Sequence, residues 1–181
     1  MIEYVLAALA SLPVFVEDRG AERAAAKVIQ FHHVALAIDD ASRAKGWPGS
    51  DRELAALMLT VAWHETKLSL RIHAGTCRRW ECDRGRARGL WQMHAEATSS
   101  TIAWHALTGI DPASTRLAAA EAARALVRSR RMCRSLEAHG ISWVEMTLTG
   151  YAGRGCRGYL VDLPARVQTF HRLTAVSPKQ S

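Results

Sequence analysis

Long apolar runs are absent from this 181-residue chain. A helix that crosses a bilayer needs about 20 consecutive apolar residues, and no stretch of the sequence reaches that length. The best candidate, Ile2 to Val16, contains Glu3, follows no lysine or arginine and is interrupted by Pro13. A secretory signal normally starts with positive charge. We therefore expect no membrane span and no clear signal peptide, and a buried first helix or strand in this segment.

Cysteine is scarce, and a metal-binding pattern is missing. Cys77, Cys82, Cys133 and Cys156 are even in number, which permits two disulfides in an oxidising compartment and demands none in a reducing one. The first two are close enough in sequence to close a short loop. His73 lies nearby, but there is no Cys-x-x-Cys pair, so a disulfide or free thiols are favoured over a zinc site. We expect neither a metal nor a cofactor.

Internal repeats, low-complexity tracts and linkers are also lacking. Hydrophobic residues make up 49% and charged residues 23%, which excludes a disordered or collagen-like chain. The length suits one domain, which we place at 21–176, between an N-terminal segment at 1–20 and a frayed tail at 177–181. Lys and Arg number 24 against 17 Asp and Glu, a net charge of +7. Such a balance favours an anionic partner: nucleic acid, an acidic polymer or a membrane surface.

Apolar residues at helical spacing predict a mainly α fold with a small irregular or β insert. Ser50 and Glu53 form a capping box at the start of one helix. The segment from Ser69 to His94 is rich in arginine and glycine and predicts a loop with one or two short strands. The predicted helices cover 21–45, 51–68, 95–107, 114–139, 142–149 and about 159–174.

Glu65 is a lone carboxylate in the last turn of the second predicted helix. It follows Ala62, Trp63 and His64, where the helix leaves an apolar face and enters the insert. Burial there would keep the carboxyl protonated near neutral pH, as a general acid requires. The alternative is a solvated glutamate at a helix end.

Three motifs around Glu65 occur in a recognisable order. They are AWHETKL at 62–68, GRARGLWQMH at 85–94 and GYAG at 150–153. Each is weak alone, but together they resemble the soluble lytic transglycosylase and goose-type lysozyme group. Its members carry a Glu-Ser-like helix end, a Gly-x-x-Gly-Leu-x-Gln segment and a Tyr-Asn-Ala-Gly-like turn. The resemblance spans about Leu54 to Arg166.

The resemblance implies a lysozyme-like domain that cleaves the β-1,4 bond between N-acetylmuramic acid and N-acetylglucosamine in peptidoglycan. Glu65 would protonate the leaving glycosidic oxygen and then act as the base that activates the acceptor. In transglycosylases the acceptor is the sugar's own 6-hydroxyl, which gives a 1,6-anhydro end. In lysozymes the acceptor is water.

The same resemblance assigns substrate-binding roles to residues of the second and third motifs. Gln92 would offer its amide to the sugar or to the surroundings of Glu65, and Gly89 would let the backbone come close. Tyr151 would orient the catalytic carboxylate through its hydroxyl. Independently of the resemblance, Trp91 is a candidate to stack on a sugar ring, because it lies among arginines in a mixture that suits an anionic glycan. The alternatives are a surface amide for Gln92 and a core aromatic for Tyr151.

The sequence departs from the family pattern in three places. Thr66 stands where the family usually has serine, which preserves the hydroxyl, and Ala152 replaces the usual asparagine, which puts one polar contact to the substrate in doubt. Gln92 follows Glu65 by 27 positions (92 − 65), longer than in compact members. An insert closed by a disulfide would explain the excess and shape one wall of the cleft.

A second carboxylate would favour hydrolysis, because hydrolysis through water normally uses two carboxyl groups. Asp83 and Glu81 are the nearest candidates in the insert, and either can be a solvated loop charge instead. A close pairing of Asp83 with Glu65 would favour the lysozyme interpretation.

Other patterns are weaker. Residues 153–158 fit Gly-x-Gly-x-x-Gly, but too little chain follows to complete a nucleotide-binding unit. The zinc-protease pattern His-Glu-x-x-His fails because position 68 is leucine. The insert interleaves Trp80 and Trp91 with arginines, a mixture that suits nucleic acid or an anionic glycan. These arginines are Arg71, Arg78, Arg79, Arg84, Arg86 and Arg88.

We therefore expect a monomeric peptidoglycan lytic transglycosylase that binds glycan strands rather than nucleic acid. Hydrolysis of the same bond is the first alternative. A non-catalytic protein of the virion, or one that binds cell wall or nucleic acid, is the second. The substrate implies a periplasmic, extracellular or phage-virion location.

Overall fold

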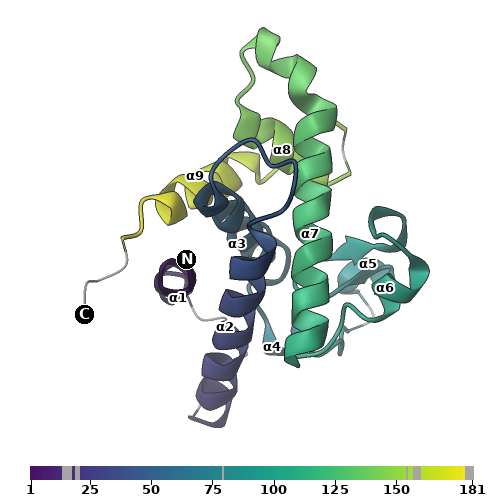
Figure 1. The fold of residues 1–181 in the computed structure, drawn as a ribbon. Coiled ribbons are helices and arrows are strands. Elements are labelled where there is room, and N and C mark those ends of the chain that lie inside the picture. Colours follow the sequence, from purple (N-terminus) through teal and green to yellow (C-terminus); the bar gives the residue numbers. More distant parts are fainter. Residues whose placement is uncertain (14–17, 19–20, 79, 154, 157–159, 178–181) are drawn as a thin grey trace.

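The computed structural model describes residues 1–13, 18, 21–78, 80–153, 155–156 and 160–177. Within them the chain is mainly helical with a small two-stranded sheet, which confirms the predicted fold class (Figure 1). The helices are α1 Ile2–Ala10, α2 Ala21–Ala41, α3 Asp51–Thr66, α4 Leu70–His73, α5 Cys82–Gly85, α6 Thr101–His105, α7 Pro112–Cys133, α8 Trp143–Tyr151 and α9 Leu163–Thr174. The strands are β1 Ala87–Arg88 and β2 Met93–His94, and the 3₁₀ turns are η2 Ala95–Ala97 and η3 Arg134–His139.

Helix α3 lies at the centre of the core. Every residue from Leu54 to Ala62 is buried, and the helix packs against α1, α2, α7 and α9. A helix that is apolar on all sides is stable only when other elements surround it. It begins at the predicted capping box, in which the Ser50 side chain accepts from the Glu53 backbone N–H and the Glu53 carboxylate accepts from the Ser50 N–H.

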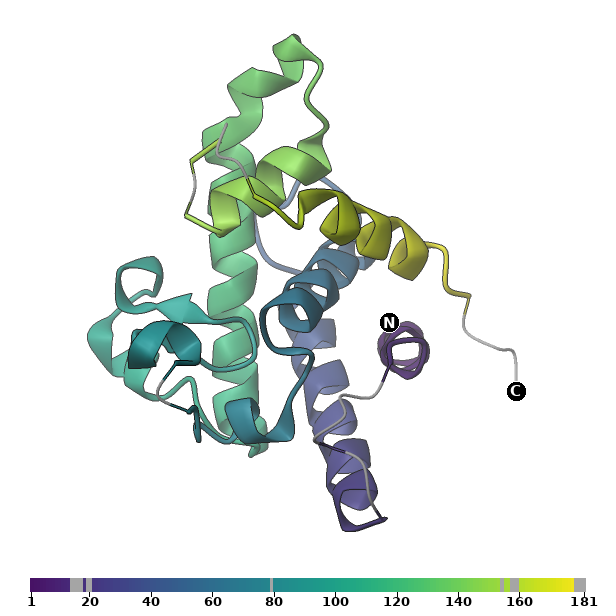
Figure 2. The same ribbon diagram turned by 180° about the vertical axis from the view of Figure 1, so that it is seen from behind.

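The first helix belongs to this core. Its residues Tyr4, Val5 and Leu9 are buried, and the Tyr4 hydroxyl donates to the carbonyl of Leu173 at 3.1 Å. Figure 2 shows α1 end-on beside α2 and α3. The expected buried element at the start of the chain is therefore a helix. Among the described residues, no helix is both long and apolar enough to cross a membrane.

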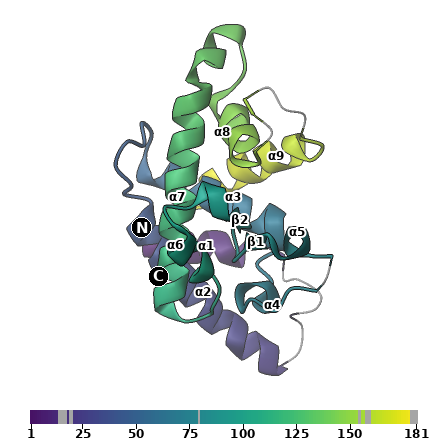
Figure 3. The same ribbon diagram turned by 90° about the vertical axis from the view of Figure 1, so that its right-hand side faces the viewer.

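The segment after α3 forms the predicted insert. Strands β1 and β2 pair antiparallel, with Ala87 opposite His94 and Arg88 opposite Met93. Figure 3 shows α4, α5 and the two strands below α8 and α9. All four residues of α5 have positive φ, so this short element coils in the left-handed sense. The expected short strands are confirmed.

The predicted helix over 95–107 is wrong. The chain forms η2, becomes extended at Thr98 and starts again as α6. Glu121 of α7 causes the break, because its carboxylate accepts hydrogen bonds from the backbone N–H and the hydroxyl of Ser99. Ser100 then caps α6 by accepting from the Ala103 N–H.

Other predicted helices differ from the structure only at their ends. Helix α2 stops at Ala41, four residues before the predicted end. The predicted helix at 114–139 is divided into α7 and η3, and α9 begins at Leu163. Of its predicted first residues, Tyr159 lies outside the described residues.

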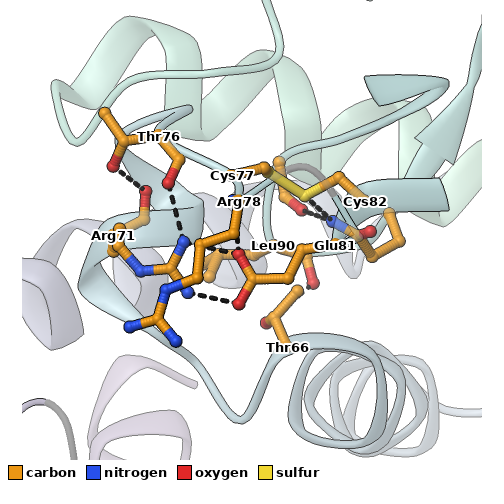
Figure 4. Close-up of a disulfide and its surroundings, with 10 residues drawn as sticks. Thr66, Arg71, Thr76, Cys77, Arg78, Glu81, Cys82 and Leu90 are labelled. Atoms are coloured by element: carbon orange, nitrogen blue, oxygen red, sulfur yellow. Dashed lines mark hydrogen bonds and ion pairs between the residues drawn. A yellow bond between two sulfur atoms is a disulfide. The ribbon is translucent and has the colours of Figure 1, made fainter. Parts of the chain in front are cut away.

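Both possible disulfides form. Cys77 is joined to Cys82 within the insert, and Cys133 at the end of α7 is joined to Cys156 in the segment after α8. Figure 4 shows the first of these closing its short loop. Cys77 and Cys82 therefore have no free thiolate with which to bind zinc, which excludes the zinc site considered for them.

The two disulfides should differ in their effect on stability. A cross-link lowers the entropy of the unfolded chain more when the closed loop is longer. For sequence separations of 23 and 5, we expect replacement of the Cys133–Cys156 pair by serines to cost about 3 kcal/mol and that of the Cys77–Cys82 pair about 2 kcal/mol. Urea unfolding of the two double variants measures this order. A larger loss from the short loop would contradict it.

His73 is a buried histidine at the end of α4. Its Nδ1 lies 3.0 Å from Nε2 of Gln30, which donates to it. Its Nε2 lies 3.1 Å from the Thr115 hydroxyl, which donates its own proton to the carbonyl of Asp111 and so accepts from His73. Burial, followed by the charge of Lys27, lowers the pKa of His73 to about 4. The imidazole is therefore neutral at pH 7.

This neutral histidine should make the fold sensitive to acid. The folded pKa lies below the unfolded value of about 6.5, so the unfolded chain binds the proton more readily and stability falls as the pH drops from 6.5 to 4. We expect His73 to account for a loss of about 3 kcal/mol across this range. The His73→Gln variant should show a flatter dependence of the unfolding free energy on pH. His105→Gln, which changes an exposed histidine, should keep the wild-type slope.

Candidate active site

An open cavity of about 840 Å³ lies where α3 ends, and it is lined by residues of the insert and of α7, α8 and α9. Four of the predicted site residues, Glu65, Asp83, Gln92 and Tyr151, line it. Its walls are formed by Glu65, Asp83, Ala87, Gln92, His94, Glu96, Ala97, Ala125, Arg128, Ser129, Met132, Gly150, Tyr151, Ala152, Gly153, Leu160 and Arg166.

Glu65 sits in the last turn of α3, where the backbone turns sharply. Lys67 and Leu68 both have positive φ, 53° and 55°, which ends the helix and redirects the chain into the insert. The buried Lys27 ammonium holds this turn: it donates to the Leu68 carbonyl and to the Asp18 carboxylate, the latter at 2.7 Å. Burial lowers the pKa of Lys27, and Asp18 counteracts that effect. The position of Glu65 is thus set by a buried ion pair.

The surroundings of Glu65 are less apolar than the sequence predicts. Its Oε1 accepts a hydrogen bond of 2.6 Å from Nη1 of Arg166, whose side chain is 7% exposed. Its Oε2 accepts no hydrogen bond from the described residues. Sequence reasoning did not predict this cation, which α9 brings to the end of α3.

Arg166 is itself held by a chain of polar groups. Its Nε donates to Asp162 at 2.9 Å, and Asp162 lies 3.3 Å from Nδ1 of His64. The other ring nitrogen of His64 lies 3.0 Å from the Thr169 hydroxyl. Burial would raise the pKa of Asp162, but its charge interactions and hydrogen bonds with Arg166 and His64 together outweigh burial and hold it below its usual value. Burial lowers the pKa of His64. This network fixes the guanidinium that contacts Glu65.

The Tyr151 hydroxyl does not hydrogen-bond to Glu65. It donates to the Trp91 carbonyl at 2.7 Å and lies 2.9 Å from the sulfur of Met93. Burial raises the pKa of Tyr151 well above 10, and the negative charge of Glu65 adds to the rise. The predicted role in orienting the carboxylate is therefore corrected: Tyr151 is a neutral phenol that ties α8 to the insert and lines the cavity.

Gln92 lines the cavity, and the nitrogen of its side-chain amide is already hydrogen-bonded within the protein. Its Nε2 donates to the Gly89 carbonyl at 3.0 Å and lies 3.4 Å from the Cys82 sulfur. Among the described residues, no donor contacts its Oε1. The amide oxygen is thus available to accept a hydrogen bond from a ligand N–H or O–H.

Two acidic residues were candidates for a second carboxylate, and only one lines the cavity. Asp83 lies on its wall, where it accepts from Arg86 at 2.9 Å and lies 3.8 Å from Nε2 of His94. Asp83 and Glu65 line the same cavity, and each is paired with a different arginine, Arg86 and Arg166. Glu81 is bound by both terminal nitrogens of Arg71, and these hydrogen bonds lower its pKa.

Trp91 and Gly89 do not contact the cavity, which corrects both predictions. Trp91 is 0% exposed, and its Nε1 donates to the Met58 carbonyl at 2.9 Å, so it cannot stack on a sugar. Gly89 has a φ of 68°, and a Cβ there would lie 2.6 Å from the carbonyl oxygen of Leu107. The close approach that requires glycine is therefore to the chain's own backbone.

The hydroxyl of Thr66 also has a structural role. It donates to the Ala62 carbonyl at 2.8 Å and lies 3.2 Å from that of Leu90, which joins the end of α3 to the insert.

Some arginines of the insert are paired within the protein. Arg86 forms an ion pair with Asp83, and the Arg88 guanidinium lies over the Trp104 ring, 4.3 Å from its centroid. Arg79 lies outside the described residues.

Sequence reasoning missed Arg166 and Asp162. One signal was available, because Arg166 shares a face of α9 with the buried Thr169, Phe170 and Leu173, at the helical spacing of an apolar stripe. An arginine in such a stripe needs a buried anionic partner. The sequence alone does not say that the partner is Glu65, 101 positions earlier.

Comparisons with known proteins give no assignment. No protein-family model matches the chain, and no match is found among curated proteins or among solved structures. Among the described residues, no group of three or more His, Cys, Asp or Glu side chains could hold a metal ion.

The close approach of Gly89 to the Leu107 backbone can be tested by substitution. Gly89→Ala should lower the unfolding free energy by about 3 kcal/mol, because it adds left-handed strain of about 1 kcal/mol and forces the Leu107 backbone to move. Gly85→Ala is the matched control: its φ is 86°, but nothing lies within 4 Å of the added Cβ. It should cost only about 1 kcal/mol. Equal losses in urea unfolding would exclude the contact.

Proposed function

We propose that this chain is a peptidoglycan lytic transglycosylase that cleaves the β-1,4 bond between N-acetylmuramic acid and N-acetylglucosamine, with Glu65 as general acid and base. The observation that supports the proposal is that residues of all three motifs meet at one cavity. Glu65, Gln92 and Tyr151 come from three motifs far apart in the sequence, yet all three line one cavity. A polymer strand needs an open site, and this cavity is open to solvent.

The acid step requires a proton on Glu65 and a partner that orients the carboxyl. Oε1 can accept from Arg166 whether the group is charged or protonated, while Oε2 is free of hydrogen bonds to the described residues. Oε2 can therefore carry the proton that passes to the glycosidic oxygen as its bond to C1 breaks. Arg166 acts here as a positioning residue.

The second step uses the same carboxylate in reverse. Glu65 takes the proton of the 6-hydroxyl as that oxygen bonds to C1, which closes the 1,6-anhydro ring and restores the protonated acid. No external nucleophile is consumed. One carboxyl group thus serves both steps.

Hydrolysis of the same bond is the second candidate, and Asp83 is the observation that favours it. Its carboxylate lines the same cavity as Glu65 and lies 3.8 Å from Nε2 of His94. A second carboxylate in the cavity can activate a water molecule for attack on the sugar. The products separate the two routes, since water leaves a reducing end.

The two disulfides support a location outside the reducing cytoplasm. We propose a periplasmic, extracellular or virion-associated protein, which is where peptidoglycan is within reach. We further propose that the protein acts as a monomer on glycan strands.

The decisive test is digestion of purified peptidoglycan, with mass spectrometry of the released fragments. Glu65→Gln should lower turnover at least about 100-fold, because the amide keeps an acceptor for Arg166 but cannot transfer a proton. Glu96→Gln is the matched control: Glu96 lines the same cavity with a side chain 81% exposed. It should retain turnover and a folded circular dichroism spectrum, as Glu65→Gln should retain its fold.

The fragments then decide the route. Anhydro-muramic ends support the transglycosylase, and reducing ends that disappear in Asp83→Asn support the hydrolase. Undiminished turnover in Glu65→Gln would remove Glu65 from the mechanism. Binding of peptidoglycan without any fragments would favour the non-catalytic alternative.

A further inference from the structure

A second cavity, of about 640 Å³, lies beside α5. It is lined by Cys77, Arg78, Trp80, Arg84 and Gly85. Helix α5 borders both cavities, because its Asp83 lines the first and the next two residues, Arg84 and Gly85, line the second. A linear polymer that leaves the first cavity over α5 would reach the second.

Trp80 is the most unusual side chain at this second cavity. It is 75% exposed, whereas Trp91, from the same insert, is fully buried. No aromatic ring or cation of the described residues packs on the Trp80 indole. An exposed indole offers a flat apolar face on which a ring can stack.

The loop that carries Trp80 is held by covalent and polar links. The Cys77–Cys82 disulfide closes it. Figure 4 shows that Arg71 binds Glu81 through both terminal guanidinium nitrogens, while the Arg78 backbone N–H donates to the same carboxylate. Trp80 lies between these anchors. A ligand that binds a loop fixed in this way loses less entropy than one that must order it.

The charge around Trp80 favours an anionic ligand. The two acidic side chains nearest in sequence are neutralised within the protein, Glu81 by Arg71 and Asp83 by Arg86. Arg84 is exposed and forms no ion pair with a described residue. A cation beside an open indole can pair with a carboxylate while the indole stacks on the apolar face of a sugar.

We infer that the Trp80–Arg84 cavity binds a carboxylate-bearing glycan, namely the part of a peptidoglycan strand that extends past α5 from the first cavity. This inference rests on the proposed function, because continuity with the cleavage site is what favours a glycan over nucleic acid. Trp80 stacks on a sugar ring, and Arg84 binds a carboxylate of the muramic acid or its peptide. Neither residue takes part in bond cleavage.

The test measures binding rather than cleavage. Purified peptidoglycan sacculi are sedimented with the Glu65→Gln protein, which leaves them intact, and the bound fraction gives an apparent Kd. In that background Trp80→Ala and Arg84→Ala should each weaken binding about tenfold. The matched controls are Ile102→Ala, an 83% exposed apolar residue of α6, and Arg131→Ala, an exposed arginine of α7. Both should leave the Kd unchanged.

Two further measurements sharpen the assignment. Trp80→Phe should recover most of the binding lost in Trp80→Ala, since a ring is restored. Amidation of the carboxylates of the sacculi should reduce binding of the parent protein to the level of Arg84→Ala, and should not weaken Arg84→Ala further. Circular dichroism verifies that each variant is folded.

Equal binding by Trp80→Ala and Ile102→Ala would overturn the inference. So would a loss confined to binding of double-stranded DNA, which would reassign the surface to nucleic acid. Failure of the proposed function has a different signature: wild-type protein would release no fragments from sacculi, although the binding differences among these variants could still be measured.

Discussion

The burial of α3 on all sides is the constraint on which the site depends. Residues 54–62 of this helix are surrounded by α1, α2, α7 and α9, so the helix cannot shift or rotate without opening the core. Glu65 follows directly, in the last turn before the chain turns away. A carboxylate that emerges from a fully packed helix has little freedom of position, and its partners must be brought to it by other elements.

Two cations from other elements hold Glu65 and the turn that follows it. Lys27 and Asp18 form a buried pair that holds the turn after Glu65, and Arg166 reaches the carboxylate itself. A buried cation is costly unless it is paired, so each of these side chains ties its own helix to the end of α3. The acid, its positioning residue and the wall of the cavity are therefore parts of one electrostatic arrangement. The insert completes the cavity through Asp83 and Gln92.

Much of the local structure could be predicted because its causes are local. The capping box at Ser50 and Glu53 determines where α3 begins, and the apolar spacing predicts that the segment is a helix with a buried face. The break in the predicted helix at 95–107 could not be predicted in this way. It arises because Glu121, on a helix far along the chain, accepts hydrogen bonds from Ser99. Trp91 is a similar case, since nothing near it in sequence shows that its indole N–H is satisfied by Met58 inside the core.

The sequence by itself determined the mainly helical class, the start of α3 at its capping box, the short strands of the insert and the choice of Glu65, Gln92, Tyr151 and Asp83 as candidates. Each depends on residues within a few positions of one another or on the order of short motifs. Only the tertiary structure decided which candidates share a cavity, that Gly89 and Trp91 serve packing, and that Arg166 contacts Glu65. The physical reason is that burial and ion pairing depend on distances in space, and residues 101 positions apart become neighbours only when the core has formed.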